Sequence, residues 1–172
     1  MKYILPLLLL SFVNLQHIFS DSLVFGYAIS KVGCGYIRGS KGEICTEDLI
    51  NKLVGEDNVE SDIAKKWIGK EVFDAAGLVS KAFQQADAEM PTGANSAWKR
   101  TTWESKGEIA TLPKNRVCAL YREENGRMKH TGIYLGNGEY IHAKGTSDWV
   151  VKEKMPGEWT HWGIPDGSII IE

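Results

Sequence analysis

The stretch "VFDAAGLVSKAF", residues 72–83, predicts a short apolar strand that leads directly into a helix. Apolar residues then recur at helical spacing, which predicts a helix over 75–86. Asp74 stands where a helix N-cap is expected, and the small residues Ala75 and Ala76 follow it. Because free N–H groups and the macrodipole stabilise an anion, such a helix start suits a nucleophilic thiol. Here that position holds only a methyl group.

The rest of the chain divides into a helical part before Pro113 and a strand-rich part after it. Further helices are expected at 21–33, 46–55 (with Thr46 as N-cap), 61–69 and 97–105, and a glycine-rich loop at 33–43. Short β-branched or aromatic runs predict strands at 116–122, 130–136, 139–144, 149–154, 161–165 and 168–172. Helices followed by an antiparallel sheet indicate an α+β domain.

Length and charge limit the classes of function. The chain has 172 residues, which suits one domain with a proper core, and no repeat or linker divides it. A formal net charge of -2 gives no electrostatic footprint for nucleic acid or for an anionic membrane. We therefore expect no nucleic-acid partner.

The first twenty residues differ from the rest and predict a signal peptide. Lys2 precedes an apolar run over 3–13, which is short for a membrane span but suits the core of a signal peptide. Cleavage after Ser20 would leave a single exported domain over 21–172 without a membrane anchor. An uncleaved anchor is the alternative.

The chain has three cysteines, Cys34, Cys45 and Cys118. Export would permit a disulfide, and Cys34 with Cys45 is the pair closest in sequence. The other interpretation is that all three are free, with Cys118 buried in a strand. No pair has the spacing of metal ligands, so we expect no zinc site.

Two histidines flank the turn "GNG" at 136–138. A tight hairpin there would place His130 and His142 on neighbouring strands, within reach of each other. A cysteine peptidase needs a thiol at a helix start, a histidine base and a polar group that fixes the base. The sequence offers each of these features except the sulfur.

Three motifs in this order resemble the NlpC-type family of peptidoglycan endopeptidases, which are papain-like. The family's nucleophile motif is D-C-[SA]-G-[LF]-[VI], and this chain has "DAAGLV" at 74–79. The second motif is matched by "HTGIYLGNG" at 130–138 and the third by "YIHA" at 140–143. A glycine-rich stretch with a tyrosine, "GCGYIRG" at 33–39, also has a counterpart in the family. The resemblance covers residues 24–166 and implies N-terminal helices packed on a central antiparallel sheet.

The resemblance assigns roles to individual residues. Ala75 takes the position of the nucleophilic cysteine, His130 that of the general base and His142 that of its orienting partner. Contacts with the substrate or the oxyanion are implied for Tyr36, Asp74 and Ala76. The expected protein is a secreted monomer without a cofactor, and its partners are bacterial peptidoglycan stem peptides, cut at γ-D-glutamyl–diamino acid bonds.

Ala75 departs from the family's pattern, and alanine cannot form a covalent acyl intermediate. One explanation is an engineered Cys→Ala variant of an active peptidase, which the intact His130, His142 and Tyr36 favour. The second is a natural pseudoenzyme that binds cell-wall peptides without cleaving them. A related papain-like amidase is a further alternative.

Overall fold

The computed structural model describes residues 4–56 and 58–167, with side chains of the first helix from residue 15 onward. The strand predicted at 168–172 lies outside this part. The helices are α1 (Ile4–Ser30), α2 (Glu47–Leu53), α3 (Val59–Ala64), α4 (Ala75–Gln84) and α5 (Ala94–Arg100), with 3₁₀ turns at Lys65–Trp67 and Ile109–Thr111. The strands are β1 (Gly35–Tyr36), β2 (Lys41–Ile44), β3 (Glu71–Phe73), β4 (Trp103–Glu108), β5 (Cys118–Glu124), β6 (Arg127–Tyr134), β7 (Glu139–Ala143), β8 (Val150–Lys154) and β9 (His161–Pro165).

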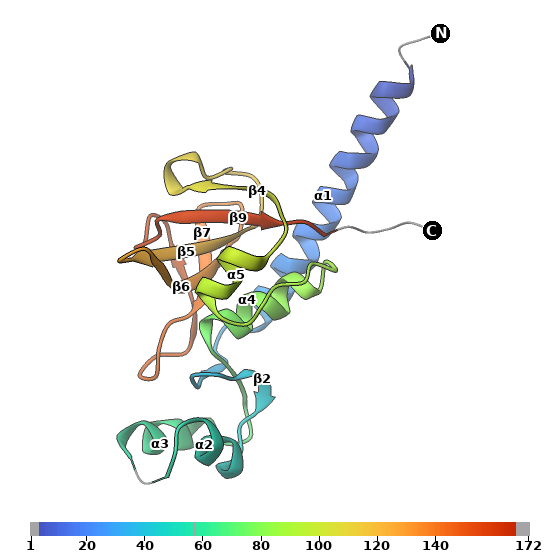
Figure 1. The fold of residues 1–172 in the computed structure, drawn as a ribbon. Coiled ribbons are helices and arrows are strands. Elements are labelled where there is room, and N and C mark those ends of the chain that lie inside the picture. The colour runs from blue at the N-terminus through green and yellow to red at the C-terminus, as the bar shows by residue number, and fades with distance from the viewer. Residues whose placement is uncertain (1–3, 57, 168–172) are drawn as a thin grey trace.

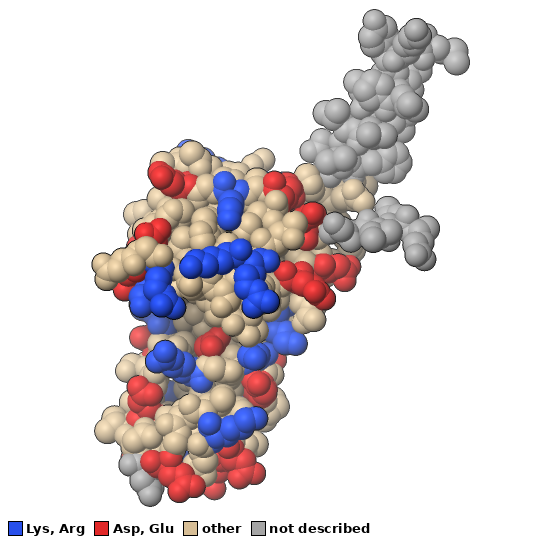
Figure 2. Space-filling model, viewed as in Figure 1, with Lys and Arg blue, Asp and Glu red and all other residues tan. Residues whose placement is uncertain are grey.

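A six-stranded antiparallel sheet forms the centre of the molecule, in the order β4-β9-β5-β6-β7-β8. Figure 1 shows α4 and α5 lying against one face of this sheet. The predicted α+β architecture, with N-terminal helices on an antiparallel sheet, is confirmed. Figure 2 shows a group of basic side chains over the region of α4 and α5, with acidic side chains around it. Lys99 and Arg100 in the last turn of α5 are exposed members of this region.

Strand alternation divides the apolar side chains between the two faces of the sheet. On one face, Ile133 and Ile141 belong to the core that also contains Leu78 and Phe83 of α4. On the other face, Trp159 belongs to a second core with aromatic and aliphatic partners from β5, β6, β7 and β9. Because neighbouring residues point in opposite directions, β5, β6 and β7 each contribute to both cores.

A smaller sheet in the order β1-β3-β2 links α4 to the α2–α3 region. β3 pairs in parallel with β1 and antiparallel with β2. A third apolar cluster lies here and includes Ile37, Ile50, Trp67 and Val72. The prediction of a continuous loop over 33–43 is therefore wrong in part, because short strands form where β3 supplies backbone partners.

The predicted helix over 97–105 is also wrong at its C-terminal end. α5 ends at Arg100, and 103–108 form the edge strand β4, which pairs with β9. Burial alternates along β4, because one side chain in two faces the protein. Trp103 lies so close to Gly163 that a Cβ there would come within 2.5 Å of its ring. Tertiary pairing decides the conformation of this segment.

The other predicted helices agree more closely with the structure. Thr46 caps α2, because its hydroxyl accepts a hydrogen bond from the N–H of Leu49 at 3.1 Å. α4 covers the predicted helix over 75–86 except its last two residues, and the hairpin at 136–138 joins β6 to β7. All three cysteines of the chain are free, and Cys45 and Cys118 are buried.

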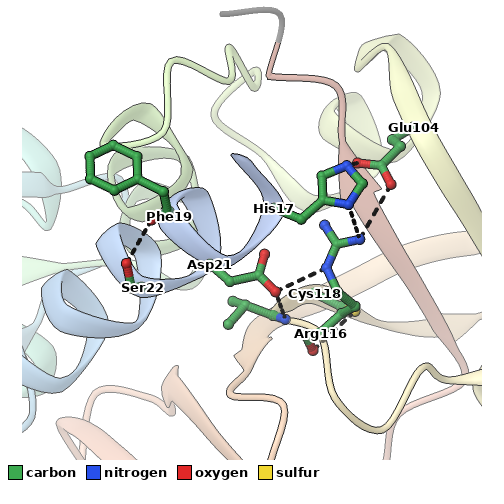
Figure 3. A network of polar contacts seen from close by, with 8 residues as sticks. His17, Phe19, Asp21, Ser22, Glu104, Arg116 and Cys118 are labelled. Atoms are coloured by element: carbon green, nitrogen blue, oxygen red, sulfur yellow. Dashed lines mark hydrogen bonds and ion pairs between the residues drawn. The ribbon is translucent and has the colours of Figure 1, made fainter. Parts of the chain in front are cut away.

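α1 passes without a break through the predicted cleavage point after Ser20. Its second half is attached to the domain by a polar network (Figure 3). Asp21 accepts hydrogen bonds from Nε of Arg116 and from the N–H of Val117, both at 3.0 Å. Nη1 of Arg116 also lies 3.3 Å from Nδ1 of His17. The helix expected over 21–33 thus begins earlier than predicted and ends at Ser30.

The first turns of α1 project away from the rest of the molecule in Figure 1. Among the described residues, no helix is long and apolar enough to cross a membrane. Leu15, Ile18 and Phe19 of α1 are exposed, whereas Val24 and Ala28 are buried in the core beside α4. Contact with the domain therefore increases along α1 toward its C-terminus.

Candidate active site

Asp74 fixes the start of α4 with both oxygens of its carboxylate. Oδ1 accepts a hydrogen bond from the N–H of Gly77 at 2.6 Å, and Oδ2 accepts one from the N–H of Gly39 at 2.9 Å. Its backbone is extended, with φ −88° and ψ 172°, as is typical of an N-cap residue. Ala75 is consequently the first residue of the helix and is partly exposed.

Close backbone packing brings the turn before β2 against this helix start. A Cβ at Gly77 would lie 2.4 Å from the carbonyl oxygen of Ser40, so only glycine permits the approach. The first N–H groups of a helix have no intrahelical acceptor, and they carry the positive end of the macrodipole. The start of α4 can therefore stabilise negative charge near Ala75 and Ala76.

Tyr36 lies beside the same helix start. It pairs in register with Phe73, the residue before the Asp74 cap. Burial raises the pKa of the Tyr36 hydroxyl, and the charge of Asp74 raises it further. The hydroxyl therefore keeps its proton at neutral pH and can donate a hydrogen bond.

The two predicted histidines meet across the β6–β7 hairpin. Nε2 of His130 lies 2.8 Å from Nδ1 of His142, which is hydrogen-bond distance. The ring centroids are 5.1 Å apart, and the planes cross at 70°. Nε2 of His142 in turn lies 2.9 Å from Oε2 of Glu153 on β8. Two imidazoles and a carboxylate thus form a continuous chain of hydrogen bonds.

Glu153 is a residue that the sequence analysis did not identify. Its carboxylate also accepts hydrogen bonds from the hydroxyl of Tyr140 and from Nζ of Lys144, both at 2.9 Å. These donors, together with His142, lower the pKa of Glu153 to about 2. In the sequence, Glu153 belongs to a strand of alternating charges, "VVKEK", which resembles any solvated strand face.

Trp159 covers the histidines and was also not singled out from the sequence. Its ring stacks on that of His130 with 5.6 Å between centroids and an angle of 11°. Gly132 makes this possible, because a Cβ there would lie 2.8 Å from the Trp159 ring and 3.1 Å from Cβ of His142. Trp159 is only 7% exposed, so it shields this side of the pair from water.

Burial keeps both imidazoles neutral at physiological pH. It lowers the pKa of His130 to about 3, and the neighbouring His142 and Arg122 lower it further. Burial also lowers the pKa of His142, although the bond to Glu153 opposes this shift. A neutral imidazole has one bare nitrogen and can act as a general base.

A cavity of about 440 Å³ opens beside the histidines. Four charged side chains other than Glu153 line it: Arg122, Lys144, Asp148 and Glu158. Within the described residues, no group of three or more His, Cys, Asp or Glu side chains is arranged to hold a metal ion.

The predicted site residues thus form two groups. His130 and His142 line the cavity, on the face of the sheet that carries Trp159. Tyr36, Asp74, Ala75 and Ala76 lie around the start of α4 and do not line it. Backbone pairing connects the groups: Gly35, next to Tyr36, bridges to Trp149, and Val150 pairs with Ala143, the neighbour of His142.

Comparison with known proteins identifies relatives of this arrangement. Residues 64–163 match the model of the NlpC/P60 family. No curated protein sequence matches the chain. Solved structures with the same fold include the resuscitation promoting factor interacting protein RipA in a mutated form (TM-score 0.61, 21% identity, covering 88% of this chain and 64% of that one).

Two further structures carry peptidoglycan hydrolase in their names. RipB from Mycobacterium tuberculosis has a TM-score of 0.58 at 20% identity, over 86% of this chain and 65% of that one. The NlpC/p60 domain of SagA has a TM-score of 0.56 at 16% identity, over 85% of this chain and 98% of that one. The chain thus spans less than two thirds of RipA and RipB but nearly all of the SagA domain.

Proposed function

Because the chain belongs to the NlpC/P60 family, we propose that it is a peptidoglycan endopeptidase of the cysteine type in which Ala75 occupies the nucleophile's position. The proposed substrates are stem peptides of bacterial cell wall, and the proposed bond is γ-D-glutamyl–diamino acid. The unsubstituted chain binds such peptides but does not cleave them, since a methyl group has no lone pair with which to attack. The proposed location is outside the cell, after removal of residues 1–20.

The observation that carries this proposal is the 2.8 Å contact between His130 and His142. Two buried imidazoles in direct contact would be costly as a purely structural feature, because an apolar pair would fill the same space without polar atoms to satisfy. Both rings are neutral at physiological pH, so each keeps one nitrogen with a lone pair.

A cysteine at position 75 would complete a four-step acyl transfer. Because Ala75 and His130 belong to separate groups, the two must first approach each other. His130 would then take the thiol proton, and the thiolate would attack the carbonyl carbon of the scissile amide. The resulting oxyanion would be stabilised by the free N–H groups of the first turn of α4 and by the hydroxyl of Tyr36. The imidazolium would return its proton to the leaving amine, and water would then hydrolyse the thioester.

The chain's own cysteines are unsuited to replace the missing thiol. Burial raises the pKa of Cys34, Cys45 and Cys118 alike, so each remains a protonated thiol at neutral pH. Cys34 is the only one of the three that is partly exposed, and the neighbouring Glu71 raises its pKa further. A reactive thiol therefore has to be introduced at position 75.

The decisive experiment compares the unsubstituted chain with Ala75→Cys and Ala75→Ser. Each protein is incubated with purified peptidoglycan, and the soluble products are identified by mass spectrometry. The proposal predicts that only Ala75→Cys releases fragments cut after D-glutamate, because the Ser hydroxyl lacks a comparable acidity. Release of whole stem peptides would instead indicate an amidase.

A natural pseudoenzyme that binds cell-wall peptides without cleaving them is the second candidate, favoured by a cavity that is formed at the histidines although the nucleophile is missing. It predicts that Ala75→Cys folds and binds muropeptides as tightly as the unsubstituted chain, yet releases nothing. Calorimetry on both proteins with the same muropeptide measures this directly, and cleavage by Ala75→Cys rejects it.

A further inference from the structure

We propose that Glu153 is a positioning residue that fixes the tautomers of both histidines, so that Nδ1 of His130 stays bare. This inference rests on the proposed function for its purpose but not for its test. Three observations support it: the two successive contacts of 2.8 and 2.9 Å, the anchoring of Glu153, and the ring of Trp159 that holds His130 in place.

Glu153 is held as an ionised acceptor. The ammonium of Lys144 bonds Oε1, and the hydroxyl of Tyr140 donates to Oε2. Tyr140 and Glu153 are direct partners in the β7–β8 ladder, and His142 lies two residues farther along the same face. Burial and the bond to Glu153 raise the pKa of Tyr140 to about 12, so this hydroxyl stays a donor. The carboxylate therefore meets donors only.

The position of each proton follows from this end of the chain. An ionised carboxylate can only accept, so Nε2 of His142 must carry a proton. Because His142 is neutral, its Nδ1 is bare and accepts from Nε2–H of His130. His130 is neutral as well, so its own Nδ1 is bare. Nδ1 of His130 forms no hydrogen bond with any described residue, which leaves its lone pair open.

Packing prevents the rings from escaping this arrangement. Trp159 stacks flat on His130, and Gly132 leaves no space between Trp159 and the Cβ of His142. A 180° turn of either ring would place a carbon where a nitrogen now bonds. With rotation blocked, the only remaining freedom is the tautomer, and the carboxylate of Glu153 selects one.

The test uses side-chain ¹⁵N NMR on the unsubstituted chain, where long-range ¹H–¹⁵N couplings identify the protonated nitrogen of each histidine. At pH 7 we expect His130 and His142 both to be neutral Nε2–H tautomers. Detection of an Nδ1–H tautomer at His130 would overturn the proposal without any variant.

Two variants then separate cause from coincidence. Glu153→Met keeps the side-chain length but removes the acceptor, so we expect a measurable Nδ1–H population at His130. Glu139→Met is the matched control, because Glu139 lies on β7 and pairs with Lys152 at 3.0 Å without touching a histidine. The control should keep both tautomers. Unchanged tautomers in a folded Glu153→Met protein would also refute the proposal.

The same substitutions in Ala75→Cys measure the consequence for a thiol. Alkylation of the introduced thiol by iodoacetamide at pH 7 should slow about tenfold with Glu153→Met, because part of the base is then in the wrong tautomer. If the tautomers follow the prediction but Ala75→Cys cleaves no peptidoglycan, the proposed function fails and the positioning role stands. If Ala75→Cys cleaves peptidoglycan but the tautomers do not change in Glu153→Met, the proposed function stands and the positioning role fails.

Discussion

Two polar networks, each built from histidine, glutamate and other charged groups, occupy different ends of the sheet. The Arg116 cluster consists of Arg116, Asp21, Glu104 and His17, and it joins α1 to the sheet (Figure 3). The histidine chain consists of His130, His142 and Glu153, and it joins β6, β7 and β8. Both are partly buried and bonded at 3.4 Å or less along their main connections.

The difference lies in how completely the donors and acceptors are satisfied. In the Arg116 cluster, a permanent cation is surrounded by two carboxylates, and its side chain is 20% exposed. In the histidine chain, neutral His130 is hydrogen-bonded to His142, and His142 is hydrogen-bonded to Glu153. Nδ1 of His130 has no partner among the described residues. A saturated network stabilises the fold, whereas one with a free lone pair retains chemical reactivity at some cost in stability.

The largest expected effect removes the cover of the histidine chain. Trp159→Ala should lower the free energy of unfolding by about 3–5 kcal/mol, because a buried indole leaves a large cavity. It should also raise the pKa of His130 from about 3 toward its ordinary value of 6.5, since burial is the main cause of the shift. Urea unfolding and an NMR titration of His130 measure both effects.

Trp149→Ala is the control for this change. Trp149 is 45% exposed, makes an edge contact with Trp67 at 6.3 Å between ring centroids, and does not line the cavity beside the histidines. We expect a loss below about 1 kcal/mol and no change at His130. A His130 pKa that stays near 3 in Trp159→Ala would mean that Trp159 does not shield the pair.

The second prediction compares the same substitution in the two networks. Arg116→Ala should cost about 2–3 kcal/mol in the free energy of unfolding, because it leaves the carboxylate of Asp21 without its counterion. Arg122→Ala beside the histidine chain should cost less than about 1 kcal/mol, since its partner Glu158 is 81% exposed. Urea unfolding of both variants tests the ranking, and equal losses would remove the distinction drawn between the networks.

The helix start and the hairpin could be predicted from sequence because their determinants are local. Asp74 and the apolar spacing after it specify α4, and "GNG" specifies the turn that brings His130 and His142 together. Such features depend on residues within a few positions of each other. The succession of the other strands along the chain follows from similar local patterns. The α+β fold class could therefore be predicted as well.

The rest depends on contacts between residues far apart in sequence. Glu153 is recognisable only once β8 pairs with β7, and Trp159 only once it lies over Gly132. The segment 103–108 becomes a strand because β9 offers it an edge. Asp21 accepts a hydrogen bond from Arg116, which lies 95 positions away in the sequence. No pattern within α1 predicts this partner.

The third prediction is that acid lowers the free energy of unfolding through the histidine chain. The folded pKa of His130 is about 3 and its ordinary value is 6.5, so the unfolded state takes up the proton first as pH falls. Stability is therefore full above pH 6.5 and is lost between 6.5 and 3. From pH 7 to pH 5, His130 alone should account for about 2 kcal/mol.

Urea unfolding at pH 7, 6 and 5 measures this loss. His130→Asn should be less stable at pH 7 but should have a flatter profile, since asparagine does not titrate. Glu153 does not contribute in this window, because its pKa shift from 4.5 to about 2 matters only at lower pH. An equally steep profile in His130→Asn would assign the acid sensitivity to other groups.

The smallest expected effect lies at the outer end of the Arg116 cluster. The side chain of His17 is 35% exposed, and its Nε2 is 3.7 Å from Glu104, so the pair is a surface ion pair at most. His17→Ala should change the free energy of unfolding by less than about 0.5 kcal/mol, whereas Asp21→Ala should approach the loss in Arg116→Ala. Urea unfolding of His17→Ala, Asp21→Ala and Arg116→Ala measures the three losses. This ranking is the one expected if the folded domain begins at Asp21, the residue that follows the proposed cleavage point. A loss at His17 as large as that at Asp21 would move the boundary of the domain toward the N-terminus, and cleavage after Ser20 would then weaken the anchoring of α1.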